Sequence, residues 1–109
     1  MFKLSSDPQF THRVSVFTPV DGGHKTETMQ VRYRVLPVAD VAAFDLSTES
    51  GTTDLLSRVV VHIADLVDDG GEPLLWSDRV ANSLFALPHA RMAIVRGYFD
   101  AVTEARQKN

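Results

Sequence analysis

Two segments near the start of the chain alternate apolar and polar residues, and a turn-forming stretch separates them. Alternation with a period of two places every second side chain on the same face of a β-strand. The positions on the apolar faces are Phe10, His12, Val14 and Val16 in the first segment, and Met29, Val31, Tyr33 and Val35 in the second. Between the segments, Pro19, Asp21, Gly22 and Gly23 suit a reversing loop. The pattern therefore predicts an antiparallel β-hairpin, and its apolar face must be covered by the rest of the chain.

The next part of the chain has helical spacing. Residues 39–46 predict a short helix that Ser50 and Gly51 interrupt. Thr52 or Thr53 can then cap a longer helix, whose apolar stripe comprises Leu55, Leu56, Val59, Val60, Ile63, Leu66 and Val67. The β-branched run 59–61 would also suit a strand, but the spacing on both sides favours a helix.

A turn should end that helix, because Asp68-Asp69-Gly70-Gly71 is followed by Glu72-Pro73. Residues 74–76 are expected to be extended and packed against the core. Ser77 can cap a helix that carries Val80, Ala81, Leu84 and Phe85, and Pro88 suits the first position of a last helix. That helix should bury Met92, Ile94 or Val95, Tyr98, Phe99 and Val102. The prediction is a single α+β domain, with a hairpin before three or four short helices and with flexible ends at residues 1–8 and 104–109.

Composition narrows the function. The chain of 109 residues has a net charge of −3, and its basic residues are scattered, which argues against nucleic-acid binding because phosphate contacts need clustered Lys and Arg. The sequence contains no cysteine, so disulfides and the usual structural zinc sites are excluded, and a reducing cytoplasm is expected. No stretch approaches the roughly 20 apolar residues of a membrane span, so we expect no membrane contact.

Catalytic and metal-binding patterns are weak. The histidines His12, His24, His62 and His89 are never three or four residues apart, as a zinc site on one helix would require. The carboxylates around Gly70 lack the order of a calcium loop, and no serine lies in a nucleophile elbow. We expect no enzyme activity, no metal and no cofactor.

Large apolar residues in the second half of the chain, and one in the hairpin, could contact a partner. The candidates are Leu74, Leu75, Trp76, Phe85, Phe99 and Phe17. A Trp beside two leucines in a small domain is more often part of the core than of a contact surface, although Trp and Tyr are also enriched at interfaces. Two interpretations also exist for the polar face of the second strand, which comprises Thr28, Gln30, Arg32 and Arg34. This face could be solvated, or it could meet another subunit.

The order of motifs in the second half resembles the tail assembly chaperones of long-tailed, siphovirus-like bacteriophages and prophages. The resemblance spans roughly residues 52–109. It rests on Ile63 to Leu74, Trp76-Ser77, Leu84 to Pro88, Ile94, Tyr98, Ala101, Ala105 and Lys108-Asn109.

The resemblance implies a protein of the host cytoplasm that binds the tape measure protein, helps recruit tail tube subunits and is absent from the finished virion. It also implies that a longer form arises by translational frameshift near Lys108-Asn109 and binds the tail tube protein. A homo-oligomer is plausible because a long client offers many sites to a small partner. The alternative is a structural tail or head–tail connector subunit that forms a ring.

Overall fold

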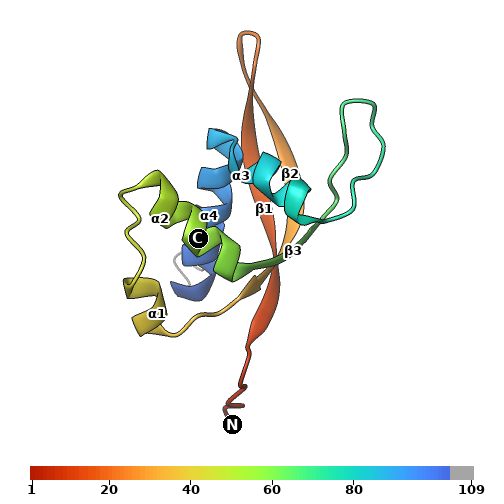
Figure 1. The fold of residues 1–109 in the computed structure, drawn as a ribbon. Coiled ribbons are helices and arrows are strands. Elements are labelled where there is room, and N and C mark those ends of the chain that lie inside the picture. Colours follow the sequence, from red (N-terminus) through yellow and green to blue (C-terminus); the bar gives the residue numbers. More distant parts are fainter. Residues whose placement is uncertain (104–109) are drawn as a thin grey trace.

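A three-stranded antiparallel sheet with the strand order β1-β2-β3 forms one layer of the molecule (Figure 1). In this computed structural model, which describes residues 1–103, β1 (Gln9–Val20) and β2 (Gly23–Arg34) form a long hairpin, and β3 (Val60–Ala64) pairs with the lower half of β2. The upper part of the hairpin extends beyond the rest of the domain (Figure 1). The predicted α+β class and hairpin are confirmed, and β3 is an addition to them.

Four helices lie within residues 1–103, and those at 88–103 and 49–59 make most of the contacts with the sheet (Figure 1). They are α1 (Val38–Ala42), α2 (Glu49–Val59), α3 (Asp78–Phe85) and α4 (Pro88–Thr103). The hairpin contributes Val14, Val16, Met29, Val31 and Tyr33 to the core, as the alternation predicted, and β3 adds Val60 and Ile63. The helical side consists of Leu55, Leu56, Val59, Phe85, Ala93, Ile94 and Tyr98.

The long helix predicted up to Val67 is wrong beyond Val59, because the chain becomes extended at Val60 and continues as β3. A β-bulge explains the error. Arg32 pairs with His62 while Tyr33 pairs with Val60, so Val61 is an extra residue in β3. The bulge lets Val60 and Ile63, three positions apart, both point into the core. The strand thereby reproduces the spacing of an amphipathic helix.

The start of α2 also differs from the prediction. The cap is Thr48, whose Oγ1 accepts a hydrogen bond from the N–H of Gly51 at 3.0 Å, so Ser50 and Gly51 lie inside the helix instead of interrupting it. Gly51 is required there because a Cβ atom would lie 1.9 Å from the carbonyl oxygen of Asp45. This glycine permits a close approach of the α1–α2 loop.

The starts of the last two helices agree with the prediction. Ser77 Oγ accepts from the N–H of Val80, and Pro88 is the first residue of α4. Ile94 and Tyr98 are buried as expected, whereas Met92 and Val102 face solvent, contrary to the expectation. The helix α4 lies close to the hairpin at Gly97, where an added Cβ would be 3.0 Å from Tyr33 Oη.

Residues 66–74 form an extended ribbon between β3 and α3 and project away from the domain (Figure 1). Val67 pairs with Pro73, and the N–H of Leu74 donates to the carbonyl of Leu66 at 2.8 Å. At the tip, Asp68 Oδ1 accepts from the N–H groups of Gly70 and Glu72. The predicted turn therefore exists, but it closes this acidic ribbon and does not end a helix.

The two predicted flexible ends have different outcomes. Residues 1–8 precede β1 without regular structure, and Asp7 forms an ion pair with Arg34 at 2.8 Å. Residues 104–109, including Ala105 and Lys108-Asn109, lie outside the described residues.

Tyr33 should make the stability of the domain sensitive to alkaline pH. Its side chain is fully buried and its Oη donates to the carbonyl of Ile94 at 2.7 Å, and burial raises its pKa above the usual range. Above a pH of about 10 the unfolded chain loses the phenolic proton while the folded chain keeps it, so the free energy of unfolding falls by up to about 1.4 kcal/mol per pH unit. Urea denaturation of the wild type and of Tyr33→Phe at successive pH values tests this. A wild-type decline no steeper than that of the variant would contradict it.

Candidate functional site

A shallow apolar groove lies where the hairpin, the acidic ribbon and the α3–α4 turn meet. It consists of two adjoining hollows of about 370 Å³ each, which share Leu66, Val67, Asp69, Leu84 and Leu87. The first hollow extends to the hairpin and to α4, where it reaches Val16, Thr18, Glu27, Thr28, Met29, Asp65, His89 and Ala90. The second extends along α3, where it reaches Leu74, Arg79, Val80 and Ser83. Three separate parts of the chain thus form one surface.

The centre of the groove is apolar and accessible. Val67 is 59% exposed and Leu87 is 45% exposed, whereas Leu66 and Leu84 are half-buried and contact the core beneath them. Leu87 is held in place because its N–H donates to the carbonyl of Leu84 at the end of α3. Adjacent apolar side chains of this kind are typical of a protein-binding surface.

Acidic groups border the hairpin side of the groove. Asp65 and Asp69 line it together with Glu27, whose carboxylate accepts from Thr18 Oγ1 at 2.5 Å. That hydrogen bond, and more weakly Lys25, lowers the pKa of Glu27. Arg79 lies at the other end. A ligand would therefore meet an apolar floor and a border that is mostly negative on one side.

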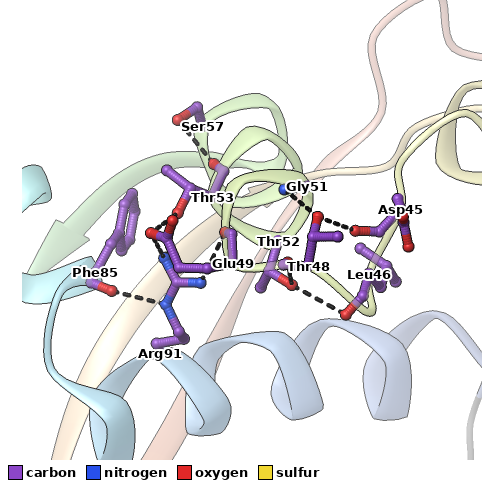
Figure 2. A network of polar contacts seen from close by, with 10 residues as sticks. All are labelled: Asp45, Leu46, Thr48, Glu49, Gly51, Thr52, Thr53, Ser57, Phe85 and Arg91. Atoms are coloured by element: carbon purple, nitrogen blue, oxygen red, sulfur yellow. Dashed lines mark hydrogen bonds and ion pairs between the residues drawn. The ribbon is translucent and has the colours of Figure 1, made fainter.

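A network around Arg91 attaches the α3–α4 turn to α2 (Figure 2). Arg91 Nε donates to the carbonyl of Phe85 at 2.8 Å, and Nη1 donates to the carbonyl of Glu49 at 3.2 Å. Nη2 donates to Thr53 Oγ1 and lies 3.6 Å from the Glu49 carboxylate. Because Phe85 ends α3, this network holds the wall of the groove that carries Leu84 and Leu87.

The structure does not bring the six predicted contact residues together. Leu74 lines the groove, whereas Leu75 is 87% exposed on the ribbon side, contrary to the expectation that residues 74–76 pack down. Trp76 packs partly against the core, with its ring centroid 6.2 Å from that of Phe85. Phe85 itself is buried.

The other two candidates lie on different surfaces. Phe99 packs partly against the core, with its ring centroid 5.3 Å from that of Tyr98. Phe17 is 58% exposed and belongs to the set of hairpin positions that alternates with the buried Val14 and Val16. The groove residues Val67, Leu84 and Leu87 were not among the candidates. Leu84 and Leu87 belong to an apolar cluster around the α3–α4 turn, but only the tertiary fold places Val67 of the ribbon beside them.

Within residues 1–103 no three His, Cys, Asp or Glu side chains gather as a metal site would require. In the same range, no helix has both the length and the apolar character needed to cross a bilayer. Comparison of the chain with protein-family models, with curated proteins and with solved structures gave no match.

Proposed function

We propose that this protein is a tail assembly chaperone of a long-tailed bacteriophage or prophage. In this proposal it binds apolar helical segments of the tape measure protein and helps recruit tail tube subunits, the latter through a frameshift-extended form. Two things support it: the resemblance over residues 52–109, and the apolar groove that the same residues largely build. The groove is the observation that carries the proposal.

An amphipathic helix suits the groove better than a small compact ligand does. Each hollow is at the lower end of the size range of small-molecule pockets, which is about 300–1,000 Å³, and both are open along one side. An amphipathic helix presents apolar side chains three, four and seven residues apart, so successive turns can fill two neighbouring hollows. The exposed Val67 and Leu87 would then be covered by the client.

A shallow groove of this kind binds weakly at a single site. A long helical client offers many such sites, and several copies of a small partner can cover its apolar stripe before the tail tube encloses it. Because the chaperone must leave again, weak individual contacts suit the role.

The test is co-expression with the tape measure protein of the same genome, comparing wild type with the double variant Val67→Asp, Leu87→Asp. Both side chains are accessible, so the variant should fold, which circular dichroism and thermal unfolding will verify. Wild type should keep the tape measure protein soluble and co-purify with it. The variant should bind the tape measure protein at least about tenfold more weakly than the wild type does. The reason is that a carboxylate in an apolar contact loses hydration without gaining a partner.

The matched control is Val38→Asp on α1, where the valine is 88% exposed and lies outside the groove. It should behave as wild type. A tape measure protein that stays insoluble with the wild type, or that binds the groove variant and the wild type equally well, would refute the proposal.

A further inference from the structure

The face of the sheet opposite the helices carries positive charge. Because Met29, Val31 and Tyr33 point into the core, the alternate residues Arg32 and Arg34 point outward. Arg13 of β1 pairs with Gln30 and shares this side, and so does His62 of β3, which pairs with Arg32. On this face the outward positions are the odd-numbered ones from 9 to 19, the even-numbered ones from 24 to 34, and 62 and 64. None of these positions is Asp or Glu. We call the surface of Arg13, Arg32, Arg34 and His62 the arginine face.

Most of this charge is available to a partner. Arg34 is paired with Asp7, the carboxylate that borders the face. Arg32 donates to Gln9 Oε1 at 3.3 Å and to Thr11 Oγ1 at 3.2 Å, which hold the guanidinium in place without neutralising it. Arg13 is exposed, and within residues 1–103 it forms no hydrogen bond or ion pair. Two of the three guanidinium groups therefore lack a carboxylate in the described part of the chain.

The acidic ribbon has the opposite charge. Asp68, Asp69 and Glu72 lie in the ribbon and Asp65 lies at its base, and no Lys or Arg occurs between residues 64 and 79. None of these carboxylates forms an ion pair in the part of the chain that the structure describes. The ribbon projects from the domain (Figure 1), and its tip is held by the hydrogen bonds that Asp68 accepts. It is thus preformed for docking.

We propose that the acidic ribbon of one copy docks on the arginine face of the next copy, so that the chain associates head to tail. The charges are complementary, Arg13 and Arg32 are exposed on the face, and the ribbon projects far enough from the domain to reach a second copy (Figure 1). Since one chain carries both surfaces at different places, each copy can engage two neighbours, and the assembly is a ring if the rotation closes and an open chain if it does not. This proposal does not depend on the proposed client, because it concerns the chain alone.

Sedimentation of the purified full-length chain over a range of concentrations is the first test. Oligomers should form at low ionic strength and dissociate at high salt, because the Debye length falls from about 10 Å at 0.1 M to about 3 Å at 1 M. A chain that stays monomeric at low salt overturns the proposal, and so does one whose arginine face binds labelled RNA instead of a second copy.

A charge-swap experiment then identifies the interface. The first double variant, Arg13→Glu with Arg32→Glu, should weaken self-association at least about tenfold. The second double variant, Asp69→Lys with Glu72→Lys, should weaken it by a similar factor. Mixing the two double variants should restore a complex, and so should combining all four changes in one chain. The controls Arg96→Glu on α4 and Asp21→Lys at the hairpin tip change the same charges elsewhere and should associate as wild type. Failure of the mixture to associate, or an equal loss in the controls, overturns the assignment.

Discussion

Replacing Tyr98 by alanine is expected to lower the free energy of unfolding by about 3–5 kcal/mol, the range for removal of a large aromatic core side chain. Tyr98 is 1% exposed, and its ring centroid lies 5.4 Å from that of Tyr33. Its Oη accepts a hydrogen bond from the N–H of Leu36 at 3.1 Å, where the chain leaves β2. A loss of this size is a large part of the about 5–15 kcal/mol that stabilises an ordinary domain.

The variant Tyr98→Phe separates the contribution of ring packing from that of the hydrogen bond to Leu36. It keeps the ring but leaves the N–H of Leu36 without its partner, which should cost about 1–3 kcal/mol. Urea denaturation of both variants and of the wild type gives the comparison. An alanine variant no less stable than the phenylalanine variant would show that ring packing at this position contributes little.

The second large effect is expected for Arg91→Ala, with a loss of about 2–3 kcal/mol. The side chain is only 14% exposed, and its removal leaves the carbonyls of Phe85 and Glu49 without the donors they have now. The Glu49 carboxylate is 82% exposed, so the ion pair itself should contribute little. Loss of this network should also loosen the α3–α4 turn, and with it the wall of the groove that carries Leu84 and Leu87.

One control keeps the positive charge at position 91, and the other removes a different arginine from the same helix. Arg91→Lys should recover only part of the loss, because a single ammonium group cannot reach three separate acceptors as the guanidinium does. Arg96→Ala, on the exposed side of α4, should change stability by less than about 0.5 kcal/mol. Thermal and urea unfolding measure all three, and an equal loss in Arg91→Ala and Arg96→Ala would contradict the role of the network.

Those parts of the fold that depend on local chemistry were predictable. The alternation around Val31 specified the hairpin, and the hydroxyl of Ser77 and the ring of Pro88 located the starts of α3 and α4. The third strand was missed because the bulge at Val61 gives a strand the burial spacing of a helix. The cap at Thr48 was missed because Gly51 looked like a breaker, although it is there to admit the carbonyl of Asp45.

The candidate site was less predictable because it depends on tertiary placement. Of the predicted contact residues, Leu74 lines the groove, whereas Phe85 belongs to the core and Phe17 is exposed on the hairpin away from the groove. Nothing local in the sequence indicates that Val67 and Leu87 become neighbours. The tape measure client, the frameshifted form and the alternative of a ring-forming virion subunit stay predictions.

The packing of α4 against β1 has a consequence for biosynthesis. Ile94 and Tyr98 complete the core that Val14 and Val16 begin, so the two halves of the core are separated by most of the chain. The hairpin can pair as soon as it leaves the ribosome, but its apolar face stays uncovered until the residues of α4 have also emerged. Folding of this domain should therefore finish only after α4 has left the ribosome, and the nascent chain should be most prone to aggregate just before that moment.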